Sequence, residues 1–112
     1  MSQPAVDLTN LRAITDGDRD LEKTLFEEFI ISFDRGLNGL RASCEENASA
    51  AWRTHAHSLK GIAVNLGGME LGELCKIAQD NYTAASALKM ETVEKITKEY
   101  QKVKEFLVQT MG

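Results

Sequence analysis

Apolar residues recur at helical spacing along most of the chain. Between about Asp18 and Cys44 they alternate at intervals of four and three residues, which places them on one stripe of a helix. The members of that stripe are Phe26, Ile30, Phe33, Leu37, Leu40 and Cys44. A second stripe repeats helical spacing toward the end of the chain, at Val93, Ile96, Tyr100, Val103 and Leu107. Both stripes predict long amphipathic helices that bury one face.

Two further helices are expected between these stripes. One reaches Asn65 or Leu66 and is halted by the pair Gly67-Gly68, and the next starts near Met69. The inward positions of this next helix are Leu71, Leu74, Cys75 and Ala78. A short helix from Asp7, carrying Leu8 and Leu11, precedes them all. The pattern predicts an all-α fold: an antiparallel four-helix bundle, up-down-up-down, whose short extra N-terminal helix acts as a lid.

Small residues line one flank of the first long helix, at Ser32, Gly36, Gly39 and Ser43. Glycine inside a helix costs roughly 1 kcal/mol relative to alanine, so its presence needs a reason. One reason is the close approach of a neighbouring helix. The other is a groove for a partner's helix.

Length and charge limit the classes of function. The chain has 112 residues, enough for one domain, and we treat residues 1–112 as that domain. Its formal net charge is −4 with no basic stripe, so nucleic acid is not an expected partner. No apolar run approaches the ~20 residues that span a bilayer, and the start Met1 to Pro4 lacks the features of a signal peptide. We expect a cytoplasmic protein with no membrane partner, whose two cysteines are buried thiols.

His57 is the candidate for chemistry. Counted at ~100° per residue, the apolar residues of its helix lie on the opposite side, so its imidazole is expected to point out of the core. The residues expected beside it are Arg53, Thr54, Lys60, Gly61 and Val64. His55 falls with the core stripe instead and is expected to be a partly buried structural histidine. The i, i+4 histidine pair of helical metal sites is missing, so no metal is expected.

The neighbours of His57 fit a phosphorylated histidine. Lys60 can offset the charge of a phosphoryl group, or it can be a solvated surface lysine. Gly61 leaves room for a partner to approach, and an exposed Val64 extends a weakly apolar patch against which the partner can dock. Gln79 is as far after Gly68 as His57 is before it, so a hairpin places the two at similar height. Its amide can accept the imidazole N–H and leave the other ring nitrogen free; it can also be a plain surface glutamine.

The run Ala56-His57-Ser58-Leu59-Lys60-Gly61, followed by Gly67 and Leu71, resembles the motif of the histidine-containing phosphotransfer (HPt) domains of two-component phosphorelays. The resemblance extends over nearly the whole chain. It departs from the family pattern at Ile62, where smaller residues are common, and at the doubled glycine 67–68.

The resemblance implies a phosphocarrier rather than an enzyme. His57 would accept a phosphoryl group from the aspartate of one receiver domain and pass it to another, with Lys60 stabilising it. Ala56, Gly61 and Val64 would give access and docking, and Gln79 would orient the imidazole. The implied partners are response-regulator receivers and a hybrid sensor histidine kinase. The receiver would bring Mg²⁺, and this chain, a monomer, would bind no cofactor.

Two alternatives stay open at the level of the sequence. The chain lacks a Gly-rich phosphate loop and a magnesium-binding Asp-x-Asp cluster, so it is not expected to use ATP itself. It could still be an adaptor that binds a kinase or receiver without being phosphorylated. It could also be the phosphoacceptor domain of a larger kinase, although a chain that begins at Met1 favours a stand-alone protein.

Overall fold

The computed structural model describes residues 5–112, apart from the side chain of Glu46. The start of the chain, on which the expected absence of a signal peptide rested, lies outside these residues. The helices are α1 (Thr9–Thr15), α2 (Arg19–Ala42), the short 3-10 helix η1 (Glu46–Ala48), α3 (Ser49–Leu66), α4 (Met69–Asp80) and α5 (Ser86–Met111). Within the described part of the chain, no helix is both long and apolar enough to cross a membrane.

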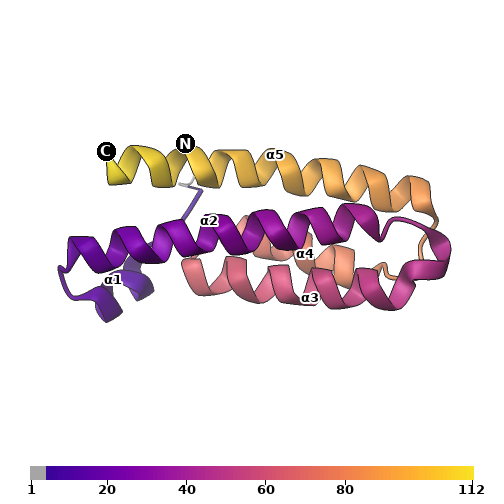
Figure 1. Ribbon diagram of the computed structural model, residues 1–112, viewed down its shortest axis with the longest axis horizontal. Helices are drawn as coiled ribbons and strands as arrows, with labels where there is room; N and C mark the ends of the chain where they lie inside the picture. The colour runs from indigo at the N-terminus through magenta and orange to yellow at the C-terminus, as the bar shows by residue number, and fades with distance from the viewer. Residues whose placement is uncertain (1–4) are drawn as a thin grey trace.

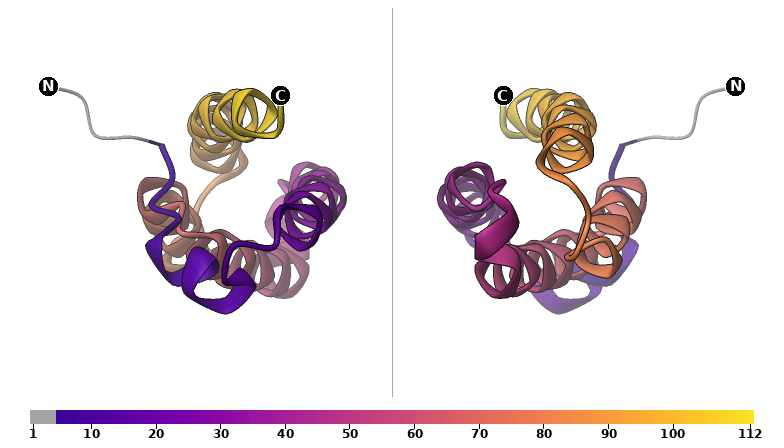
Figure 2. Two further views of the ribbon diagram at one scale, coloured as in Figure 1. Left: turned by 90° about the vertical axis from the view of Figure 1, so that its left-hand side faces the viewer. Right: turned by 90° about the vertical axis from the view of Figure 1, so that its right-hand side faces the viewer.

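Helices α2 to α5 form a closed ring of neighbours. In sequence order each packs on the next, and α5 packs back on α2 (Figure 1). Seen along its length, the bundle has the four helices around a common axis, with α1 beneath one end (Figure 2). The expected up-down-up-down bundle with a short extra helix is therefore confirmed. Helix α4 is the shortest of the four, with 12 residues beside the 24 of α2 and the 26 of α5.

The core follows the two predicted stripes closely. All five expected residues of α5 are buried, and so are four of the six in the α2 stripe. Ile30 and Cys44 are only half-buried, and Phe29 takes a place in the core instead. Phe29 and Phe33 pack against Tyr100, with ring centroids 6.1 Å and 4.5 Å from it. This aromatic cluster ties α2 to α5.

The small residues on α2 face α3. A Cβ added at Gly36 would lie 2.5 Å from Cδ2 of Leu59, and one added at Gly39 would lie 2.5 Å from Cε1 of His55. Contacts that short leave no room for a side chain. The glycines therefore allow α2 and α3 to approach closely, and they do not open a groove for a partner.

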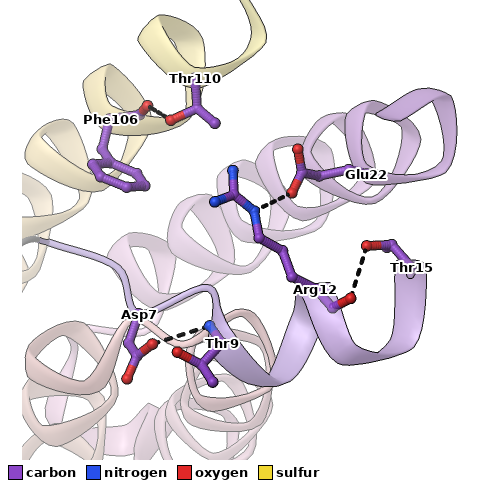
Figure 3. Close-up of polar contacts among 7 residues, drawn as sticks. All are labelled: Asp7, Thr9, Arg12, Thr15, Glu22, Phe106 and Thr110. Carbon is purple, nitrogen blue, oxygen red and sulfur yellow. Dashed lines mark hydrogen bonds and ion pairs between the residues drawn. The ribbon is translucent and has the colours of Figure 1, made fainter. Parts of the chain in front are cut away.

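Helix α1 and the residues before it close one end of the bundle. The backbone N–H of Asp7 donates to the carbonyl of Gly67, 2.9 Å away, in the turn between α3 and α4. Gly67 has φ +104° and sits against the backbone of Asp7, so glycine is needed there for both reasons. Arg12 of α1 donates to Glu22 of α2 at 2.8 Å (Figure 3). Helix α1 starts two residues later than expected, and the Asp7 carboxylate accepts from the N–H of Thr9.

Candidate functional site

The buried stripe of α3 fixes the direction of His57. The residues of α3 that face the core are Trp52, Ala56, Leu59, Ala63 and Leu66. They recur at helical spacing, and Leu59 and Trp52 are fully buried. His57 lies on the other side of the helix and is exposed. The outward direction predicted from the sequence is confirmed.

Ala56 requires a correction. It was expected to contribute to access and docking beside His57, but its side chain is completely buried. Helix α3 is covered on two sides, by α2 and by α4, so its buried sector is broad. At ~100° from His57, Ala56 falls inside that sector. A partner cannot contact it, and its small size serves the packing of the bundle.

The space over His57 is open on its C-terminal side. Gly61 is exposed, and a Cβ built on it would meet nothing within 4 Å. Val64, one turn further on, is 42 % exposed. His57, Gly61 and Val64 therefore share one accessible face of α3. A glycine with open space around it has no packing reason to be there, unlike Gly36 and Gly39.

Two cations flank His57 on the same helix, and their side chains point differently. Helical side chains lean toward the N-terminus of their helix. Lys60 is half-buried one turn after His57, and this lean would bring its side chain toward the turn that carries His57. Arg53 leans away, and its guanidinium lies 5.0 Å from the ring centroid of Tyr82. Neither cation forms an ion pair with a carboxylate in the described part of the chain.

The charge of α3 differs from that of the rest of the chain. Its 18 residues include no Asp or Glu, although the whole sequence has 17 acidic residues and a net charge of −4. The charged side chains that α3 itself places around His57, those of Arg53 and Lys60, are both cations. A positive, exposed face suits an anionic partner.

Two contacts set the register between α3 and α4. A Cβ at Gly72 would lie 2.9 Å from Cγ2 of Val64, and Arg53 reaches Tyr82 just after α4. His57 lies between these contacts on its helix, and Gln79 lies between them on the other. Gln79 is half-buried. Among the described residues no hydrogen bond joins its amide to the imidazole, so its orienting role stays a prediction.

His55 has a packing role. It is half-buried, and its ring fills the space beside Gly39 on α2. The site therefore contains one accessible imidazole, that of His57, and one that is held between helices. Separating the two from the sequence required only the angle between residues two apart on a helix.

The site is a surface and not a pocket. A hollow with a volume of about 680 Å³ lies beside the α3–α4 turn and is lined by residues around α1 and by Phe106 (Figure 3). His57 does not line it. Within residues 5–112, no three His, Cys, Asp or Glu side chains gather as ligands for a metal ion. An exposed nucleophile on an open face is suited to meeting another protein.

The contact between Arg53 and Tyr82 could not be found from the sequence. Angles on one helix place Arg53 near His57, but they do not say which residue of another element meets its guanidinium. Tyr82 follows the end of α4, and its position depends on where that helix stops. The only sign of this contact in the sequence was the presence of an aromatic residue, Tyr82, at the end of the predicted helix.

Comparison with known proteins gives a consistent family and fold. The model of the Hpt domain family matches residues 24–106. The crystal structure of histidine-containing phosphotransfer protein B (HptB) from Pseudomonas aeruginosa PAO1 superposes with a TM-score of 0.85, at 24% sequence identity. The superposition covers 98% of this chain and 96% of that one. A search among curated protein sequences found no match.

Proposed function

The chain belongs to the Hpt domain family, and on that premise we propose that it is a phosphocarrier of a phosphorelay with His57 as its phosphoacceptor. The observation that carries this proposal is the orientation of the two histidines. His57 is exposed on the face of α3 that also carries Arg53 and Lys60, whereas the ring of His55 lies against Gly39. Only His57 is free to meet the active site of a partner.

The proposed reaction is a reversible displacement at phosphorus. The lone pair of one imidazole nitrogen of His57 attacks the phosphorus of an aspartyl phosphate on a receiver domain. The P–N bond forms as the P–O bond to the aspartate breaks, and the aspartate leaves as a carboxylate. In the second half, the aspartate of another receiver attacks the phosphohistidine and the imidazole leaves. The direction of net flow depends on the receivers.

Each neighbour has a role in this scheme. Lys60 leans toward His57 and pairs with the phosphoryl oxygens as a point charge. Gly61 keeps the space beside the imidazole open, and Val64 provides an apolar contact for the receiver. The carbonyl of Gln79 accepts the N–H of the imidazole, which holds the other nitrogen ready as the nucleophile. This last contact would form when the receiver docks.

The receiver supplies what this chain lacks. Mg²⁺ bound by the receiver would neutralise the charge that develops on the transferring phosphoryl group. The donor is a receiver domain, including that of a hybrid sensor kinase, so the chain needs no ATP site of its own. This makes it a carrier substrate in the cytoplasm and not an enzyme.

The experiment that tests the proposal compares the two histidines. The protein is incubated with the purified, ³²P-labelled receiver domains of the same organism, and transfer is followed for wild type, His57→Gln and His55→Gln. We expect label on wild type and His55→Gln and none on His57→Gln. Circular dichroism checks that both variants remain helical. Label on His57→Gln would refute the assignment.

The same experiment tests the adaptor alternative. A protein that binds receivers without being phosphorylated would take no label from any of them, yet would still associate with one in a titration. The open space beside Gly61 suits the approach of a receiver in both cases, so the label decides between the phosphocarrier and the adaptor.

A further inference from the structure

We propose that Arg53, held in place by Tyr82, is a docking residue that binds a surface carboxylate of the receiver domain. The inference rests on the proposed function, because the receiver is the partner that brings the carboxylate. It adds a residue that recognises the partner without touching the phosphoryl group. Tyr82 is the corresponding positioning residue.

Arg53 is one helical turn before His57, on the same face of α3. Its side chain runs away from His57 and across to Tyr82, where the guanidinium lies 5.0 Å from the ring centroid. Lys60, on the other side of His57, leans toward it. The two cations would therefore have different roles. Lys60 would be near the phosphoryl group on His57, and Arg53 would lie at the edge of the surface on which the receiver docks.

The stacking on Tyr82 prepares the guanidinium for binding. An exposed arginine normally samples many rotamers, and ordering it on binding opposes association. The ring of Tyr82 restricts that motion in advance and interacts with the face of the cation. The N–H groups around the edge of the guanidinium stay available, because no described carboxylate pairs with Arg53. A planar donor of this kind matches a carboxylate in a bidentate geometry.

The positive charge of Arg53 favours a carboxylate as the group that it binds on the receiver. Helix α3 carries Arg53 and Lys60 and has no acidic residue. A receiver domain transfers its phosphoryl group from an aspartate and holds Mg²⁺ with oxygen ligands, so acidic groups lie around its active site. A carboxylate at the border of that site, about one helical turn from the group that meets His57, would face Arg53. Complementary charges at such a border raise the rate of encounter and fix the orientation of docking.

The test separates docking from chemistry. The rate of phosphoryl transfer is measured against the concentration of the fastest phosphorylated receiver, which gives a half-saturating concentration and a maximal rate. Arg53→Ala should raise the half-saturating concentration about five- to tenfold at low salt and leave the maximal rate and phosphohistidine lifetime unchanged. The wild type should lose its advantage over Arg53→Ala as salt is added. Lys60→Ala should affect the other quantities. It should shorten the phosphohistidine lifetime or lower the maximal rate and leave the half-saturating concentration unchanged.

The variants of Tyr82 test its positioning role. Tyr82→Phe keeps the ring and should behave as the wild type, whereas Tyr82→Ala should raise the half-saturating concentration by less than Arg53→Ala does. Lys98→Ala removes an exposed cation from α5, diagonal to α3 in the ring of helices, and is the matched control. Equal half-saturation for Arg53→Ala and wild type would overturn the proposal. A shortened phosphohistidine lifetime in Arg53→Ala would overturn it too, because Arg53 would then be a ligand of the phosphoryl group.

Calorimetric titration with the unphosphorylated receiver keeps the two proposals distinguishable. If the wild type binds the receiver but takes no label, the phosphocarrier function fails, and the affinity of Arg53→Ala still decides the role of Arg53. If the wild type transfers phosphate normally and Arg53→Ala binds the receiver with unchanged affinity, the docking role of Arg53 is refuted and the phosphocarrier function is not. A wild type that binds no receiver at all refutes both.

Discussion

At the scale of single residues, substitutions of Gly61 are expected to raise stability and lower phosphoryl transfer. Its Cβ position is open, so Gly61→Ala should raise the free energy of unfolding by up to ~1 kcal/mol through the better helix propensity of alanine. Gly61→Gln should also fold well, yet its side chain would stand beside the imidazole. Thermal melts and a receiver-transfer time course on the three proteins should show transfer falling from glycine to alanine to glutamine while the melting temperature holds or rises.

Two results would contradict this account of Gly61. If both variants unfold at a lower temperature than the wild type, Gly61 is needed for packing within the bundle. If both transfer at the wild-type rate, the receiver does not approach over Gly61, and the docking surface lies elsewhere on the bundle.

The residues of α3 show how far angular reasoning reaches. It correctly separated His57 from His55, because residues two apart point in nearly opposite directions. It failed for Ala56, which is about 100° from His57 and could belong to either side. The width of a buried sector depends on how many helices cover it, and α3 is covered by both α2 and α4. That number is a property of the assembled bundle and cannot be read from one helix.

At the scale of helices, Gly36 in the contact between α2 and α3 is expected to respond to alanine in the opposite way to Gly61. Gly36→Ala places a Cβ 2.5 Å from Cδ2 of Leu59, which is fully buried, so the Leu59 side chain or the helices must shift. Overpacking of this kind costs about 1–3 kcal/mol, more than alanine regains in helix propensity. Urea denaturation should therefore show Gly36→Ala less stable than wild type. A gain in stability would mean that Leu59 can yield and that the two helices need not be so close.

Helix positions were predictable where the sequence carries strong stops. The doubled glycine at 67–68 ends α3 at Leu66, and Asp18 caps α2 by accepting from the N–H of Leu21. The small polar stretch after Tyr82 is a weaker stop than a glycine pair, and α4 ends before it, at Asp80. The choice between close packing and a partner groove at Gly36 and Gly39 needed the neighbouring helix itself. Local sequence cannot supply a contact between residues about twenty positions apart.

At the scale of the whole molecule, Tyr100 links α5 to α2 through a buried phenol. Its hydroxyl donates to Oδ1 of Asp34 at 2.6 Å, and burial, followed by this hydrogen bond and the charge of Asp34, raises its pKa above the usual value of 10. A raised pKa in the folded state means that the unfolded chain loses the proton first. The stability that Tyr100 contributes is therefore present below about pH 10 and is lost as the pH rises further.

A comparison with Tyr100→Phe isolates this contribution. Near neutral pH the variant should be less stable by about 1 kcal/mol, because it loses the hydrogen bond. Above pH 10 the free energy of unfolding of the wild type should fall more steeply than that of the variant, so the difference between them shrinks. Urea titrations between pH 7 and pH 11 measure both curves. Parallel curves would show that the phenol does not titrate with unfolding.

The most direct test of the central claim is to locate the phosphoryl group on the folded protein. After transfer from a receiver, long-range ¹H–¹⁵N correlation spectra at alkaline pH report which imidazole carries phosphorus, and wild type, His57→Gln and His55→Gln supply the assignments. We predict a single phosphoimidazole, at His57, that is stable in alkali and lost in acid. Phosphorus on His55, or on neither imidazole while the protein holds the label, would contradict it.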